Sequence, residues 1–105
     1  MRATVIGTMP TSLPLAHEVR AERVAQLAKA LADPVRAGLL EAVHRSGDEV
    51  CQCDLQPLFA VSQPTLSHHL RRLTDAGLLT IERRGRWAYY RTDPDALEVL
   101  RSWLS

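Results

Sequence analysis

The sequence lacks several features, and each absence excludes a class of protein. No apolar run among its 105 residues approaches the roughly 18 residues of a membrane-spanning helix. The N-terminus has no apolar segment typical of a secretion signal. Internal repeats and low-complexity segments are also missing. A chain of this length is expected to form one domain, which we expect to be cytoplasmic and without a membrane partner.

Motifs typical of enzymes are missing as well. The chain has no Cys-x-x-Cys pair, no phosphate-binding loop and no recognisable nucleophile–base pair, so we expect no catalytic residues. The two cysteines, Cys51 and Cys53, are too close in sequence to staple a fold. We therefore expect reduced thiols in a cytoplasm, and no permanent cofactor.

Net charge is small, at +1, which argues against a general polycation. The distribution of charge is uneven, however. Residues 62–91 carry six basic side chains (Arg71, Arg72, Arg83, Arg84, Arg86 and Arg91) against two acidic ones (Asp75 and Glu82), whereas the flanking segments are neutral or acidic. This local excess predicts a surface that meets phosphate.

The spacing of apolar residues predicts a mainly α-helical fold with a small β-hairpin. Residues 1–14 resemble a flexible arm, and residues 15–105 form one domain. The predicted order is ααααββα, with a possible extra short strand before the third helix. Helices are expected at about 15–32, 34–45, 55–60, 63–76 and 94–104, and strands at 79–83 and 87–91.

Pro57 limits where the third helix can begin, because proline in a helix interior costs roughly 3 kcal/mol. With Asp54 as the N-cap, Pro57 falls in the tolerated first turn. A helix starting at Val50 would place it in the interior. Cys51 and Cys53 are therefore expected in an extended segment before this helix, or in its frayed first turn. In an extended segment, residues two apart face the same way and can bind one ion.

The third and fourth predicted helices, joined by a short turn, are typical of a helix-turn-helix, and the hairpin after them is typical of a wing. Polar residues near the start of the fourth helix are expected to reach base edges, and arginines further along are expected to contact phosphate. The hairpin tip should contact the minor groove or the backbone. The DNA-binding residues predicted in this way are Gln63, Thr65, Ser67, His68, Arg71, Arg72, Arg83, Arg84 and Arg86. His69 leans toward the core, and we interpret it as a half-buried structural histidine.

The sequence closely resembles the ArsR/SmtB family of metal- and metalloid-responsive repressors. The resemblance covers about residues 25–97 and rests on four segments: ALADPVRAGLL, CQCDL, SQPTLSHHLRRLTDAGLL and RRGRWAYY. It implies a homodimeric winged helix-turn-helix repressor that leaves its double-stranded DNA operator when an inducer binds. Because a twofold dimer presents two recognition helices, we expect the operator to be an imperfect palindrome.

Cys51 and Cys53 match the first two sulfur ligands of the family's CxCDLC segment, so the resemblance implies metal-binding cysteines and trivalent arsenic or antimony (arsenite or antimonite) as inducer. Gln56 occupies the position of the third cysteine. Solvent, a small thiol or His17 of the partner are the candidates for the third ligand. The family's other site needs histidine on the last helix, and residues 93–105 have none.

Two alternatives to an arsenic-responsive repressor remain open. A repressor of the same fold could sense another soft ion, such as zinc, cadmium, lead or nickel, or have lost its response. A thiol redox switch could instead act through a Cys51–Cys53 disulfide. No positive cluster beside the cysteines favours a low thiol pKa, which the redox switch would need.

Overall fold

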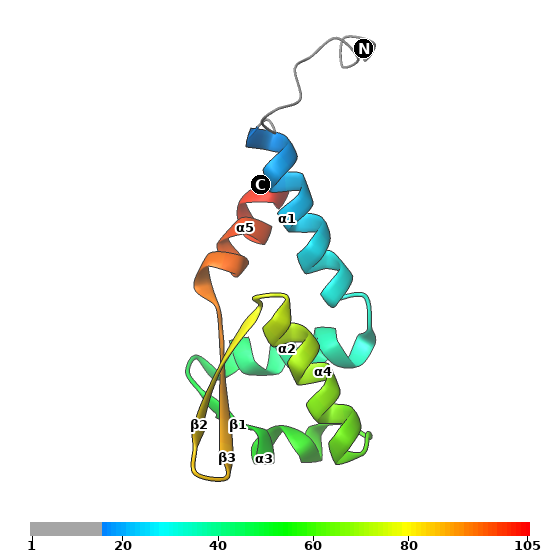
Figure 1. Cartoon of the computed structure of the whole chain (residues 1–105), viewed down its shortest axis with the longest axis vertical. Helices are drawn as coiled ribbons and strands as arrows, with labels where there is room; N and C mark the ends of the chain where they lie inside the picture. The colour runs from blue at the N-terminus through cyan, green and yellow to red at the C-terminus, as the bar shows by residue number, and fades with distance from the viewer. Residues whose placement is uncertain (1–15) are drawn as a thin grey trace.

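The protein is a winged helix-turn-helix domain, as the sequence predicts (Figure 1). The structure, a computed structural model, describes residues 16–105, and the predicted arm at 1–14 lies outside the described residues. The described elements are α1 (Ala16–Ala30), α2 (Pro34–Ser46), β1 (Val50–Cys51), α3 (Gln52–Leu55), the 3₁₀ helix η2 (Gln56–Leu58), α4 (Gln63–Asp75), β2 (Leu79–Arg84), β3 (Trp87–Thr92) and α5 (Pro94–Leu104). The extra short strand before the third helix is therefore present, as β1.

Three strands form one antiparallel sheet in the order β1-β3-β2. β2 and β3 form the hairpin, with Arg84 opposite Trp87 at its tip. β1 pairs with the other edge of β3, with Cys51 opposite Tyr89. The segment carrying the cysteines is thus joined to the wing through backbone hydrogen bonds.

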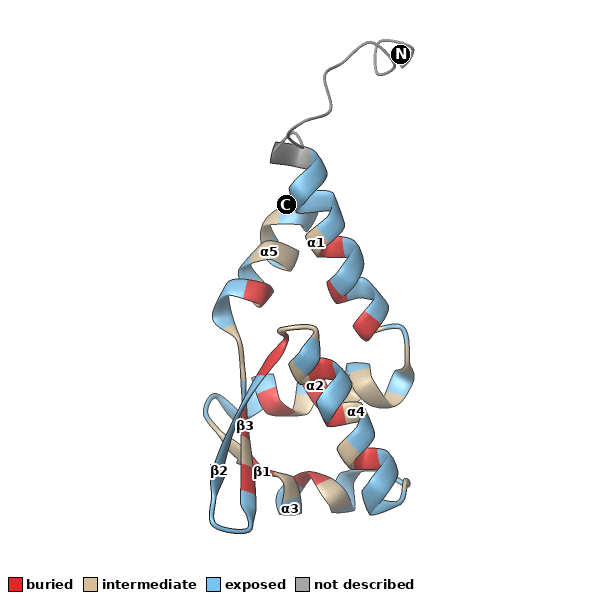
Figure 2. Ribbon diagram, in the orientation of Figure 1, coloured by how far each residue is buried: buried red, intermediate tan, exposed pale blue. Residues whose placement is uncertain are grey.

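The core lies between α2, α4 and the base of the hairpin, where many of the buried residues gather (Figure 2). Leu66, Leu70 and Leu73 form the buried stripe of α4, as their spacing predicts. Leucines from α1, α2, α3 and β2 complete the core. The largest fully buried side chains are Leu27, Leu39, Leu55, Leu66, Leu70, Leu73, Leu78, Leu79 and Val43.

Both ends of α4 are fixed by specific hydrogen bonds. Ser62 caps its N-terminus by accepting the Thr65 N–H at 3.3 Å. Gly77, whose φ of 85° lies in the left-handed region, ends it as predicted. The Leu78 N–H returns to the Leu73 carbonyl at 3.0 Å. Arg23 of α1 donates to the Ala76 carbonyl at 2.9 Å, so a cation from another helix also stabilises this C-terminus.

The prediction that Asp54 caps the third helix is wrong. α3 begins at Gln52, and its N-cap is Cys51, whose backbone is extended (φ −71°, ψ 141°) and whose sulfur accepts the Cys53 N–H at 3.4 Å. Asp54 lies inside the first turn, where its charge also favours a helix N-terminus. Pro57 has no N–H for the α-helical ladder, and there the chain tightens into η2.

α1 and α5 contact each other and project beyond the helix-turn-helix (Figure 1). Their outer surfaces leave large apolar side chains exposed: Val19 (51%), Trp103 (54%) and Leu104 (76%). Among the described residues, none of the helices has the length and apolar character that crossing a membrane requires.

Candidate DNA interface and thiol pair

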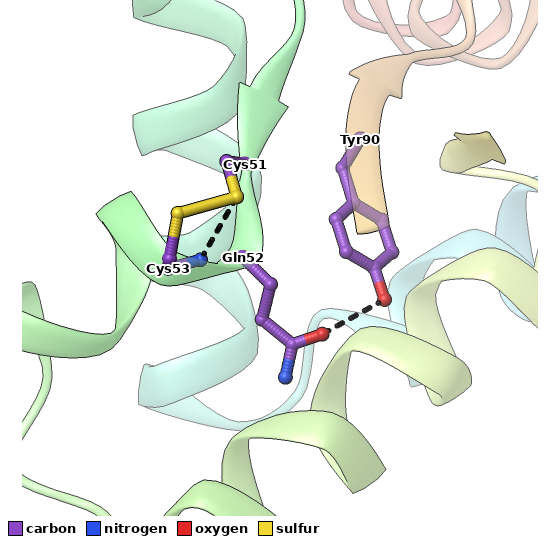
Figure 3. The surroundings of a disulfide bond; sticks show 4 residues. All are labelled: Cys51, Gln52, Cys53 and Tyr90. Carbon is purple, nitrogen blue, oxygen red and sulfur yellow. Dashed lines mark hydrogen bonds between the residues drawn. A yellow bond between two sulfur atoms is a disulfide. The ribbon is translucent and has the colours of Figure 1, made fainter. Parts of the chain in front are cut away.

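Cys51 and Cys53 bring their sulfur atoms into direct contact at the junction of β1 and α3 (Figure 3). They are joined as a disulfide with a Cα–Cα distance of 5.2 Å, whereas the sequence favoured two reduced thiols. Cys51 is buried in an extended backbone, and Cys53 is exposed in the first turn of α3. Cys51 thus lies in the extended segment and Cys53 in the first helical turn, the two positions that the sequence predicts, because α3 begins between them. The sulfur atoms nevertheless converge, since the chain bends at this point.

The side chain between the two cysteines reaches the other functional elements. Gln52 donates from Nε2 to the Ser67 hydroxyl of α4 at 2.7 Å. The Tyr90 hydroxyl of β3 donates to Gln52 Oε1 at 3.4 Å (Figure 3). Burial raises the pKa of Tyr90, so this phenol remains a donor at neutral pH. Sequence reasoning assigned Gln52 no role, because its partners lie 15 and 38 residues away.

A cavity of about 680 Å³ separates α3, the outer face of α4 and the wing. Cys51, Cys53 and Gln56 line one part of it. Polar and basic side chains predicted to meet DNA line another part, namely Gln63, Ser67, Arg71, Arg83 and Arg86. The structure thus places Cys51 and Cys53, which we call the thiol pair, beside the predicted DNA interface.

The predicted contacts on α4 occupy its outer side. Gln63, Thr65, His68, Arg71 and Arg72 are exposed, and Ser67 is half-buried beside α3. The Thr65 hydroxyl is held at 2.9 Å by that of Ser62. His69 is half-buried, as predicted, with Nδ1 3.3 Å from Arg36 Nη1.

The three wing arginines differ in their surroundings. Arg84 forms a two-point ion pair with Glu49, at 2.8 and 2.6 Å, and also contacts Glu82. Its guanidinium lies 4.3 Å from the centre of the Tyr89 ring and holds the pKa of Glu82 below its usual range. Arg83, one residue earlier in the strand, faces the cavity with Ile81. Arg86 stacks over Trp87 at 5.1 Å. Within the described part of the chain, no ion pair holds Arg83 or Arg86.

No group of three or more His, Cys, Asp or Glu side chains among the described residues is arranged to hold a metal ion. Gln56 occupies the position at which the CxCDLC segment has its third cysteine, and its amide Nε2 donates to the Val61 carbonyl at 2.8 Å. The side chain of His17, the partner ligand considered from the sequence, lies outside the described residues.

Residues 33–80 match the family described as "Bacterial regulatory protein, arsR family". The arsenical resistance operon repressor of Bacillus subtilis is 40% identical over 70% of this chain and 70% of its own length. The arsenic resistance transcriptional regulator ArsR1 of Pseudomonas putida is 43% identical over 64% of this chain. The chain spans only about half the length of that relative (52%) and of one from Halobacterium salinarum (49%).

Solved structures show the same fold. A possible transcriptional regulator for arsenical resistance has 38% identity and a TM-score of 0.66, over 75% of this chain and 79% of that one. The homodimeric winged helix-turn-helix DNA-binding domain of a Mycobacterium bovis protein has a TM-score of 0.66, over 90% of this chain and 84% of that one. Its identity is 23%, so it supports the fold alone.

Proposed function

We propose that this chain, which belongs to the arsR family of bacterial regulatory proteins, is a homodimeric transcriptional repressor that arsenite or antimonite releases from its DNA operator. The observation that carries the proposal is the position of the thiol pair. Cys51 and Cys53, whose sulfur atoms are in direct contact, line the same cavity as the outer face of α4 and the wing. The names of the B. subtilis and P. putida relatives support arsenic as the inducer.

DNA binding is assigned to α4 and the wing. Gln63, Thr65, Ser67 and His68 lie near the N-terminal half of α4 and present donors and acceptors to base edges. Arg71 and Arg72 supply positive charge for phosphates, and the wing adds Arg83, Arg84 and Arg86. Arg84 reaches a phosphate only by exchanging its Glu49 and Glu82 partners, so Arg83 and Arg86 are the principal wing contacts.

Inducer binding is assigned to the reduced forms of Cys51 and Cys53. Soft thiolates favour soft ions over magnesium or calcium. Coordination by both sulfur atoms fixes the bend between β1 and α3, on which Gln52 and its bond to the recognition helix depend. A ligand that changes this bend acts on Ser67 of α4 through Gln52, and it thereby favours a dimer that fits DNA less well. By linkage, DNA must weaken ligand binding by the same factor by which the ligand weakens DNA binding.

A gel shift with arsenite tests the proposal directly. Near-stoichiometric arsenite should release the wild-type protein from its operator, and a coupling of about 1–3 kcal/mol gives roughly 5- to 150-fold weaker DNA binding. Cys51→Ser and Cys53→Ser should bind the operator nearly as well as wild type but ignore arsenite. Normal release of either serine variant would refute the assignment.

A redox-responsive repressor is the second candidate, and the direct contact between the two sulfur atoms favours it. In that case peroxide should release the operator and a reducing agent should restore binding. Mass spectrometry of the reduced protein separates the two functions, because arsenite adds the mass of an arsenic adduct whereas peroxide removes two hydrogens. Zinc in a third arm tests for another soft ion.

A further inference from the structure

Gln56 contains a buried oxygen that lacks a partner. Its Oε1 is buried, and among the described residues the structure shows no hydrogen-bond partner for it. Its Nε2 is already bonded to the Val61 carbonyl at 2.8 Å, so exchanging the two ends of the amide would place two acceptors together. Buried acceptors of this kind are normally paired, and an open one is therefore suited to receive a donor from a ligand.

The position of Gln56 relates it to the thiol pair. η2 continues directly from α3, and the Gln56 N–H bonds to the Gln52 carbonyl across the junction. Residues three apart on a helix lie on the same side, which places Gln56 one turn beyond Cys53. Both cysteines and Gln56 line the same cavity. The two cysteines and the residue with the unpaired amide oxygen therefore border one space.

The chemistry of arsenite supplies the missing donor. Arsenous acid has three hydroxyl groups, and each thiol replaces one: As(OH)₃ + 2 Cys–SH → (Cys–S)₂As–OH + 2 H₂O. Two As–S bonds form and two As–O bonds break, each thiol proton leaves in a water molecule, and arsenic remains trivalent. One hydroxyl remains on arsenic, because the described residues offer no third side chain for coordination.

We infer that Gln56 Oε1 accepts a hydrogen bond from the hydroxyl retained on arsenic, so that this site recognises a hydroxo-arsenic dithiolate. The inference rests on the function proposed above. Gln56 then has a role in place of a third sulfur, because its side chain selects a ligand that keeps one hydroxyl group. A site built to pair with a ligand hydroxyl discriminates against an analogue that lacks it, because its own polar group is then left unpaired.

Two arsenicals separate this role from a structural one. Phenylarsonous acid also reacts with two thiols but loses both of its hydroxyls, so its adduct has none to donate. Gln56→Met, which keeps the length of the side chain but removes the amide, should weaken arsenite binding about tenfold. Phenylarsonous acid binding should stay within about twofold of wild type by the same measure. An equal loss for both ligands, as expected from a disturbed loop, or no loss for arsenite, would overturn the inference.

A second variant tests whether the side chain at position 56 reaches the ion. X-ray absorption of the wild-type complex should show two sulfurs and one oxygen around arsenic. Gln56→Cys should convert this to three sulfurs, and an unchanged two-sulfur shell would show that residue 56 is out of reach and would overturn the inference. Failure of the proposed function would look different: the wild-type protein would then not bind arsenite, or would bind it equally well without its cysteines.

Discussion

The side-chain amide of Gln52 donates a 2.7 Å hydrogen bond to the hydroxyl of Ser67. This bond connects the residue between the two cysteines to the middle of the recognition helix, and the Tyr90 hydroxyl approaches the other end of the same amide. A change in the bend between β1 and α3 therefore reaches α4 through one side chain. We expect Gln52 to transmit the inducer signal without binding the inducer itself.

Gln52→Met should separate inducer binding from DNA release. Both thiols remain, so arsenite should still bind, but the ratio of operator affinities without and with arsenite should fall. A typical net hydrogen-bond contribution of about 1 kcal/mol corresponds to a loss of roughly fivefold in that ratio. The ratio is the appropriate measure because Ser67 is itself a proposed DNA contact, whose loss would change absolute affinity.

Ser67→Ala supplies the matched control for this coupling. If the Gln52–Ser67 bond carries the signal, each single variant and the double variant should lose the same amount of coupling. Additive losses would show that the two residues act independently, and an unchanged ratio in Gln52→Met would exclude it from transmission.

The elements that could be predicted from sequence are those determined by local chemistry. Asp33, Ser62 and Asp93 cap helices as their types and following prolines indicate, and Gly77 ends α4 because its backbone is left-handed. The stripe of leucines on α4 faces the core because these residues recur at helical spacing along the chain. Such residues need only their neighbours in the chain to specify their structure.

The start of α3 differs from the predicted one because Cys51, and not Asp54, is the N-cap. Asp54 is the stronger cap in general, but β1 pairs Cys51 with Tyr89 and holds its backbone extended, which allows the helix to begin immediately afterwards. This contact joins residues 38 apart in the sequence. The partners of Gln52 and Arg84 could not be predicted for the same reason, since they depend on the packing of the sheet.

The wing arginines should make unequal contributions to the salt dependence of DNA binding. Each phosphate contact steepens the log–log slope by about 0.9. Arg83→Ala and Arg86→Ala should each flatten the slope by about that amount and weaken binding to all sequences alike. Arg84→Ala should change it less, because Arg84 is already paired with Glu49 and Glu82. Equal slopes for wild type, Arg83→Ala and Arg86→Ala would remove the wing from the interface.

Base recognition should depend on α4 and not on the wing. Gln63→Ala should reduce discrimination between operator and non-operator DNA, by about 1–3 kcal/mol if its amide contacts a base edge. Competition binding with specific and random duplexes measures this quantity. A uniform loss on both duplexes would instead assign Gln63 to the phosphate backbone.

Asp33 should make stability depend on pH. Hydrogen bonds from the backbone N–H of Arg36, above all, hold the pKa of Asp33 below its ordinary value of 3.8. Its carboxylate therefore contributes stability above that ordinary value, and the contribution is lost as pH falls through the lowered pKa. Asp33→Asn, which can still cap α2, should unfold with a smaller dependence on pH between about 5 and 2. If thermal unfolding of the wild-type protein and of Asp33→Asn depended on pH in the same way, Asp33 would not be a source of the pH dependence.

The exposed apolar surface of α1 and α5 should be the dimer interface. Trp103 and Leu104 on α5 and Val19 on α1 leave an apolar area that a monomer exposes to water. A twofold dimer formed through these helices presents two recognition helices, which matches an imperfect palindrome with half-sites about one helical turn apart. Trp103→Glu should therefore give a monomer by light scattering at micromolar concentration, with helical content retained and operator binding strongly weakened.

Leu58→Glu is the matched control, because Leu58 is a similarly exposed apolar residue (64%) in η2, away from α1 and α5. It should leave the dimer intact, and a dimeric Trp103→Glu variant would place the interface elsewhere.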